Sequence, residues 1–149
     1  NSPGWKFNEY EMKGIPLRLE VGPRDIENGK VVYSIRHSGE KSDMPREGAV
    51  QAVKDMLERI HREMYEKAQK SMEEKTFVVT DYESFKQRME EKPGIAKAMW
   101  CGCSECEEKI KNETAVTIRC IPFEQENLGD TCPFCGKEAK HMVVLGKAY

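Results

Sequence analysis

The chain has 149 residues, of which 34% are charged, and its 24 basic and 26 acidic side chains leave a formal net charge of −2. This length suits one domain or two small ones, and the balanced charge excludes a strongly basic protein that attracts nucleic acid through its total charge. The sequence contains neither an apolar run of about 18 residues, as a membrane span requires, nor a signal peptide. We therefore expect a cytoplasmic protein without a membrane partner.

The first half predicts short elements followed by one long helix. A helix is expected over residues 5–13, ended by Gly14 and Pro16. Alternating apolar and charged residues predict two strands that pair antiparallel, with turns and a polar loop beside them. The strands are residues 17–21 and 30–36, the turns are residues 22–25 and 28–29, and the loop is residues 37–43. Apolar residues recurring every three or four positions predict a helix over residues 47–75.

A helix of that length cannot be covered by one short partner, so we expect it to run from one domain into the next. We place the domains at residues 1–72 and 73–149. The sequence of the second domain predicts elements in the order β-α-β-α-β-β, which makes a four-stranded sheet with helices on one face. Its strands are residues 77–79, 95–100, 116–122 and 141–145, and its helices are residues 81–91 and 105–112. Thr80 and Glu83 are predicted to form the capping box of the first helix.

Six cysteines lie in the second half, and four of them form two close pairs that suit a tetrahedral metal ion: Cys101, Cys106, Cys132 and Cys135. Thiolate ligands favour zinc over magnesium or calcium. Cys103 and Cys106 also make a CxxC motif, so spacing alone allows Cys103 in place of Cys101. Redox-active thiols, disulfides and inert thiols are the alternatives, although the Lys/Glu-rich composition indicates the cytosol, where disulfides are rare.

Longer motifs resemble the C-terminal part of prolyl-tRNA synthetases of the archaeal and eukaryote-like type, which are class II enzymes. The motifs are residues 3–8 (PGWKFN), 11–25 (EMKGIPLRLEVGPRD) and 36–41 (RHSGEK), with the four cysteines and Tyr149. The resemblance covers essentially the whole chain and begins at the second helix of the anticodon domain. The opening residues, without an initiator methionine, suggest a cut inside a larger protein. The implied fold is α/β and α+β: the C-terminal part of an anticodon-binding mixed-sheet domain, then a small β-α-β-α-β-β domain stapled by zinc.

The resemblance implies roles for particular residues. The structural zinc would be held by Cys101, Cys106, Cys132 and Cys135, with Cys103 and Cys120 as bystanders. The two adjacent guanines of the proline anticodon would be contacted by Glu11, Arg18, Asp25 and Lys41. A carboxylate can accept from the N1–H and N2–H groups of guanine, and Arg or Lys can donate to O6, N7 or a phosphate. The carboxylate of Tyr149 would point toward the catalytic domain.

The segment 36–41 departs from the family at His37, where an aspartate is usual, which puts the family's local ion pairing in question. The resemblance further implies that the parent is a homodimer that ligates proline to its tRNA, using ATP and Mg²⁺ in a catalytic domain outside these residues. The segment itself is expected to be non-catalytic, with the tRNA anticodon and that catalytic domain as partners. The alternatives are a free-standing zinc module that binds nucleic acid or protein, a small redox protein, and a purely structural domain.

Overall fold

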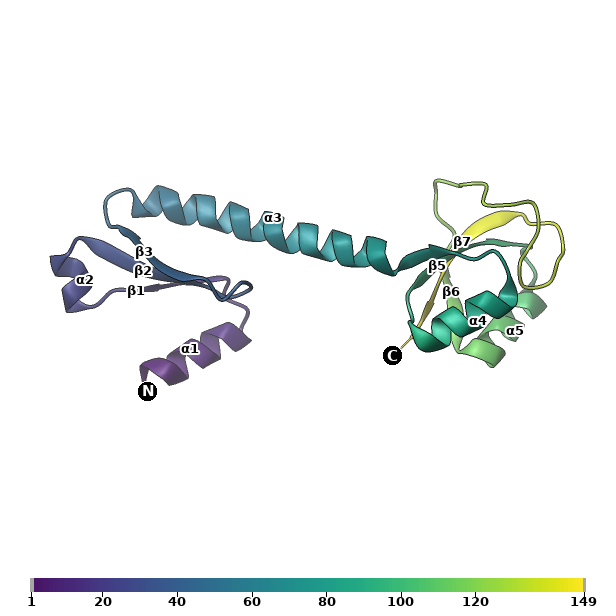
Figure 1. The fold of residues 1–149 in the computed structure, drawn as a ribbon, viewed down its shortest axis with the longest axis horizontal. Coiled ribbons are helices and arrows are strands. Elements are labelled where there is room, and N and C mark those ends of the chain that lie inside the picture. Colours follow the sequence, from purple (N-terminus) through teal and green to yellow (C-terminus); the bar gives the residue numbers. More distant parts are fainter. Residues whose placement is uncertain (1, 149) are drawn as a thin grey trace. The chain divides into compact units, whose positions relative to one another are not determined.

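The structure, a computed structural model, describes residues 2–148 and confirms the mixed α/β class with two separate sheets (Figure 1). It falls into two compact units, one that ends at Gln69 and one that starts at Lys70. This division lies within helix α3, Ala49–Lys75. The domain boundary at residue 72 stays a prediction. Among residues 2–148, no helix combines the length and the apolar character that crossing a membrane requires.

The first unit contains a three-stranded antiparallel sheet in the order β1-β2-β3, which confirms the expected pairing of the first two strands. The strands are β1 (Leu17–Glu20), β2 (Lys30–Ile35) and β3 (Lys41–Pro45). Arg18 lies opposite Ser34, and Ser34 lies opposite Lys41. Side chains at paired positions point to the same face of a sheet, so Arg18 and Lys41 share one face.

Helix α1, Pro3–Met12, precedes this sheet. Its first turn is stabilised by Ser2, whose hydroxyl accepts a hydrogen bond from the backbone N–H of Trp5 at 3.3 Å. Pro3 begins the helix at a position where a missing backbone N–H has no cost. Gly14 follows the helix with a φ of +80°, a conformation that glycine adopts without strain. The predicted helix and its end are therefore confirmed.

Two predictions for this unit were wrong. Residues 22–25 do not form a simple turn, because Pro23–Glu27 is a short helix, α2, in which Asp25 accepts from the backbone N–H of Gly22 at 2.8 Å. The predicted polar loop ends early, because Lys41–Pro45 is the edge strand β3. Only Met44 of this strand is buried. A polar edge strand lacks the apolar alternation that identifies a strand in sequence.

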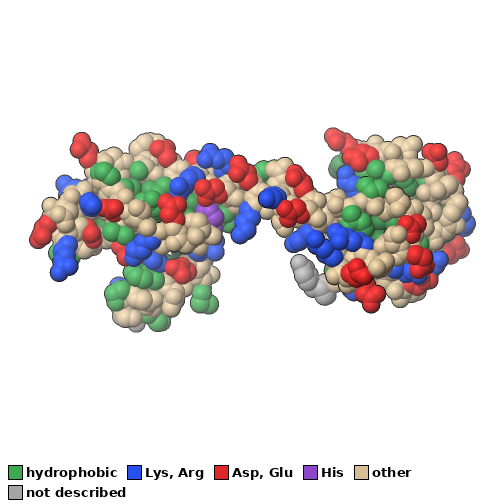
Figure 2. All heavy atoms as spheres, in the orientation of Figure 1, with side chains coloured by type: hydrophobic (Ala, Val, Ile, Leu, Met, Phe, Trp, Pro, Cys, Tyr) green, Lys and Arg blue, Asp and Glu red, His purple; other side chains and the backbone are tan. Residues whose placement is uncertain are grey.

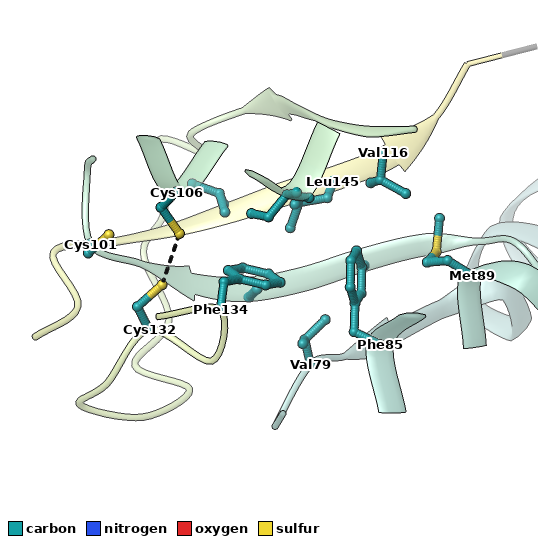
Figure 3. Packing of buried hydrophobic residues seen from close by; sticks show 13 residues of the cluster. Val79, Phe85, Met89, Cys101, Cys106, Val116, Cys132, Phe134 and Leu145 are labelled. Atoms are coloured by element: carbon teal, nitrogen blue, oxygen red, sulfur yellow. Dashed lines mark hydrogen bonds between the residues drawn. The ribbon is translucent and has the colours of Figure 1, made fainter. Parts of the chain in front are cut away.

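The second unit has the predicted order of elements and a four-stranded sheet, β4-β5-β7-β6. Its strands are β4 (Thr76–Val78), β5 (Ile95–Trp100), β6 (Val116–Cys120) and β7 (His141–Lys147). Its helices are α4 (Tyr82–Glu91) and α5 (Ser104–Thr114). Helices and strands share one buried core, part of which is seen in Figure 3. Phe85 of α4, Ile110 of α5, Ala98 of β5 and Val143 of β7 contribute to it. Ala98 lies opposite Val143, so both come from one face of the sheet.

Two details of this unit differ from expectation. Thr80 is not the cap of α4, because Asp81 takes that position and accepts from the backbone N–H of Ser84 at 2.9 Å. A carboxylate at the N-cap also interacts favourably with the helix dipole. The first strand is β4, residues 76–78, rather than residues 77–79, and Val78 is 48% exposed, so this strand is not buried throughout.

Gly94 provides a test of the close approach between the end of α3 and the start of β5, where Thr76 pairs with Ile95. A Cβ atom on Gly94 would collide with the backbone carbonyl oxygen of Lys75. We expect Gly94→Ala to lower the free energy of unfolding by about 1–3 kcal/mol, because the backbone must shift. Urea unfolding followed by circular dichroism measures this loss.

Gly146→Ala is the matched control in the same sheet. A Cβ atom there would lie 3.7 Å from the flexible side chain of Arg119, which is an ordinary contact, and neither glycine has a positive φ. We therefore expect little change from Gly146→Ala. Equal losses for the two variants would show that the contact with Lys75 is not the cause.

Candidate functional site

Four cysteine side chains of the second unit converge at one end of its sheet. β5 ends at Trp100, directly before Cys101, and Trp100 lies opposite His141 at the start of β7. The segment after β5 and the segment before β7 therefore lie at the same end of the sheet. Helix α5 begins just after β5 and contributes Cys106. The antiparallel pairing thus brings together cysteines that are about 30 residues apart in sequence.

The segment 132–136, which we call the second cysteine loop, is a tight turn. The carbonyl oxygen of Cys132 accepts from the backbone N–H groups of Cys135 at 3.4 Å and Gly136 at 2.8 Å. The backbone N–H of Cys132 donates to the carbonyl oxygen of Lys137 at 2.8 Å. Gly136 has a φ of +72°, which a residue with a Cβ atom rarely adopts. This turn presents two thiols on the same side.

The sulfur atoms of Cys101, Cys106, Cys132 and Cys135 all lie within 4.8 Å of one another. The sulfurs of Cys101 and Cys135 are 3.5 Å apart. Those of Cys106 and Cys132 are 3.8 Å apart, as the dashed line in Figure 3 marks. A tetrahedral zinc ion with four sulfur ligands at about 2.3 Å would separate those sulfurs by about 3.8 Å. The four side chains therefore fit a metal ion of this size, and each sulfur pair is too far apart for a disulfide of about 2.05 Å.

Cys103, the other candidate from spacing, lies outside this group of four. It is the N-cap residue of α5, and its thiol donates to the carboxylate of Glu105 at 2.8 Å. Its place between a strand and a helix is the one that a redox-active motif would use. Its CxxC partner, however, has its sulfur 3.8 Å from that of Cys132, in the other loop. Cys120 is exposed on β6 and also lies outside the group.

Burial affects the ionisation of these thiols. It raises the pKa of Cys101 and the pKa of Cys106 above the ordinary value for a thiol. Burial also acts to raise the pKa of Cys135, but the backbone N–H of Lys137 and hydrogen bonds with the neighbouring thiols together lower it. Four thiolates this close repel one another, so a divalent cation is needed to stabilise them together.

The second cysteine loop is anchored in the core by Phe134, which lies between its two cysteines in sequence. Its ring packs edge-on against Phe85 with the ring centres 5.4 Å apart (Figure 3). It also packs edge-on against Tyr82, with the ring centres 5.7 Å apart. The ammonium group of Lys109 lies 3.5 Å from the carbonyl oxygen of Phe134 and 4.7 Å from the ring centre of Tyr82. The cluster of thiols and the hydrophobic core are therefore parts of one packed structure.

A second cluster lies on the first unit, around Arg18. Its Nη1 donates to the carboxylate of Glu11 at 2.7 Å, and its Nε donates to the carboxylate of Glu20 at 3.2 Å. The guanidinium carbon lies 3.9 Å from the ring centre of Phe7, a distance typical of a cation–π contact. Helix α1 and strand β1 together therefore fix the side chain of Arg18.

Lys41 joins the same cluster from β3. Its Nζ donates to both carboxylate oxygens of Glu20, at 3.0 Å and 3.2 Å. The hydrogen bond from Lys41 lowers the pKa of the Glu20 carboxyl, and that from Arg18 adds to this, against the opposing effect of partial burial. We call Glu11, Arg18, Glu20 and Lys41 the charged cluster. It contains three of the four residues that the resemblance implied, together with Glu20, which sequence reasoning missed.

Asp25, the fourth implied residue, has a different environment in α2, where its carboxylate caps the backbone N–H of Gly22. Tyr149 lies outside the described residues. His37, where the family motif has a carboxylate, lies with its Nε2 at 2.8 Å from a carboxylate oxygen of Glu63 in α3. Glu40, which directly precedes Lys41, accepts a hydrogen bond from Arg59 of α3 at 2.8 Å. The turn that leads to Lys41 is therefore tied to this helix.

Basic and acidic side chains are interspersed on the face of the molecule that Figure 2 shows. This agrees with the balanced total charge, and it means that selective binding must depend on the geometry of small groups such as the charged cluster.

Comparison with known proteins assigns a family to both parts of the chain. Residues 1–56 match the family described as "Anticodon binding domain", and residues 82–149 match that described as "Prolyl-tRNA synthetase, C-terminal". The chain is 58% identical to the proline--tRNA ligase of Acetoanaerobium sticklandii over 99% of its own length and 31% of that protein. It is 56% identical to proline--tRNA ligase 2 of Clostridioides difficile, covering 98% of this chain and 30% of the relative.

A solved structure of a prolyl-tRNA synthetase is also similar to this chain. The crystal structure of a prolyl-tRNA synthetase from Cryptosporidium parvum, complexed with L-proline and AMP, matches with a TM-score of 0.86 at 35% sequence identity. The match covers 100% of this chain and 32% of that chain. The chain therefore spans about a third of the length of the relatives that it matches.

Proposed function

The chain belongs to the prolyl-tRNA synthetase family as a C-terminal region of such an enzyme, and from this premise we propose that it recognises the anticodon of proline tRNA. The parent would be a cytoplasmic, homodimeric proline--tRNA ligase that uses ATP and Mg²⁺ in a separate catalytic domain. This segment would contribute anticodon recognition and a domain with a structural zinc ion. The observation that carries the proposal is the charged cluster, which lies within the part that matches an anticodon-binding domain.

The chemistry of the charged cluster fits guanine. Guanine presents acceptors at O6 and N7 and donors at N1 and N2, so its recognition needs both cations and carboxylates. Arg18 and Lys41 supply the donors, and Glu11 supplies a carboxylate 2.7 Å from Arg18. In this proposal Asp25 contacts RNA from α2 with the carboxylate oxygen Oδ1, because Oδ2 caps Gly22.

The proposal is tested by binding of this chain to a proline tRNA transcript and to one with both anticodon guanines changed, at one fixed salt concentration. We expect the unaltered transcript to bind more tightly by about 1–3 kcal/mol per changed base. Equal binding of the two transcripts would contradict anticodon recognition. That outcome would favour the alternative, a zinc module that binds nucleic acid without regard to sequence.

Arg18→Ala should reduce this preference. We expect the affinity for the unaltered transcript to fall by about tenfold to a hundredfold, because a donor to guanine is lost. The affinity for the altered transcript should fall less. Arg62→Ala is the control, because Arg62 is an exposed residue of α3 and its loss changes the net charge equally. If the two variants reduced the binding of both transcripts to the same extent, Arg18 would act only through its charge.

For the second unit we propose that Cys101, Cys106, Cys132 and Cys135 hold one structural zinc ion. The ion would join the end of β5, the start of α5 and the second cysteine loop, and four sulfur ligands would leave no position open for substrate. Catalysis in the parent would lie outside this segment. An ATP–pyrophosphate exchange signal from the isolated 149 residues would contradict that part of the proposal.

A further inference from the structure

We propose that Glu20 is a positioning residue for anticodon recognition, whose carboxylate holds Arg18 and Lys41 in the arrangement in which they contact RNA. This inference rests on the proposed function of the first unit. It assigns a role to a residue that would not itself touch a base.

The contacts of Glu20 support this role. One carboxylate oxygen accepts from Arg18 Nε at 3.2 Å and from Lys41 Nζ at 3.2 Å, and the other accepts from Lys41 at 3.0 Å. Glu20 is the less exposed partner in its pair with Lys41, with 24% of its side chain exposed against 54%. The carboxylate is therefore shared by the two cations, one from β1 and one from β3.

The strand register explains why a single carboxylate can reach both cations. Arg18 and Glu20 are two residues apart in β1, so their side chains lie on the same face of the sheet. Lys41 lies on that face two strands away, across Ser34. Glu20 lies opposite Val32, so its contact with Lys41 crosses β2 diagonally. Long side chains lose much rotational freedom when they bind, and ordering them beforehand reduces that cost.

A positioning role and a purely electrostatic role predict opposite results for removal of this charge. If Glu20 acted only through its negative charge, Glu20→Gln would reduce repulsion of phosphates and would raise the affinity for every RNA. If Glu20 positions Arg18 and Lys41, the same change should weaken binding of the correct anticodon in particular, because an amide offers one acceptor oxygen instead of two. These cases are separated by the ratio of two affinities, that for the unaltered transcript divided by that for the altered one.

The experiment measures the affinity of three proteins for both transcripts: the unaltered full chain, its Glu20→Gln variant and its Glu58→Gln variant. Glu58 is an exposed residue of α3, and its change removes the same charge. We expect Glu20→Gln to lower the ratio of affinities by about fivefold to tenfold, with binding of the altered transcript unchanged or tighter. Glu58→Gln should leave the ratio unchanged. Thermal unfolding of each variant establishes that the first unit remains folded.

Lys41→Ala, introduced into the unaltered chain and into the Glu20→Gln variant, provides a second test. If Glu20 acts through Lys41, the effects of the two changes on the ratio should not add. A Glu20→Gln variant that binds both transcripts more tightly by the same factor, or that keeps the full ratio, would overturn the positioning role. If the unaltered chain failed to distinguish the transcripts, the proposed function itself would fail, and this inference would fall with it.

Discussion

Cys132→Ser is expected to abolish zinc binding and to unfold the unit that starts at Lys70. Cys132 is fully buried, with 0% of its surface exposed, and its sulfur lies 3.8 Å from that of Cys106. Structural zinc sites contribute about 10–16 kcal/mol of apparent binding free energy, whereas whole domains are stable by only about 5–15 kcal/mol. The free energy lost with the ion should therefore exceed the remaining stability of so small a unit.

Metal analysis should give about one zinc ion per unaltered chain and close to none for Cys132→Ser. The fluorescence of Trp100, which directly precedes Cys101, should shift to that of an exposed indole. Cys120→Ser is the control, because Cys120 is exposed and lies outside the group of four sulfurs. Cys103→Ser should likewise retain zinc. If Cys103→Ser lost the ion while Cys101→Ser kept it, the ligand assignment would be wrong.

The metal ligands illustrate how far the sequence could predict the site. Spacing identified two pairs of thiols but left Cys101 and Cys103 as alternatives. The choice depends on where β5 ends and α5 begins, and Cys103, as the N-cap residue of that helix, directs its thiol to Glu105. Sequence periodicity locates element ends only approximately, so the geometry of this turn could not be predicted from it.

The charged cluster shows a different limit. Arg18 and Glu20 alternate within a predicted strand, so the sequence already places them on one face. The stacking of Arg18 on Phe7 could not be predicted, because it depends on how α1 packs beside the sheet. The contact of Lys41 with Glu20 requires β3 to pair with β2. Polar residues fill most of that strand and predict a loop there, so β3 could not be identified from the sequence.

Phe134→Ala is expected to lower the free energy of unfolding of the second unit by about 3–5 kcal/mol, which is typical of a buried aromatic residue. Its side chain is 3% exposed and packs against Tyr82 and Phe85. All four proposed ligands remain in this variant, so one zinc ion should still bind at saturation. The affinity should fall, because binding must now also stabilise a weaker core.

Phe123→Ala is the matched control, because Phe123 is fully exposed and its removal should change stability by no more than about 0.5 kcal/mol. Chemical unfolding and competition with a zinc chelator measure the two quantities. If Phe134→Ala reduced stability while zinc affinity stayed the same, the site would form independently of the core. A parallel loss of both would mean that the ion stabilises the whole unit through the second cysteine loop, since the Phe134 side chain of that loop packs in the core.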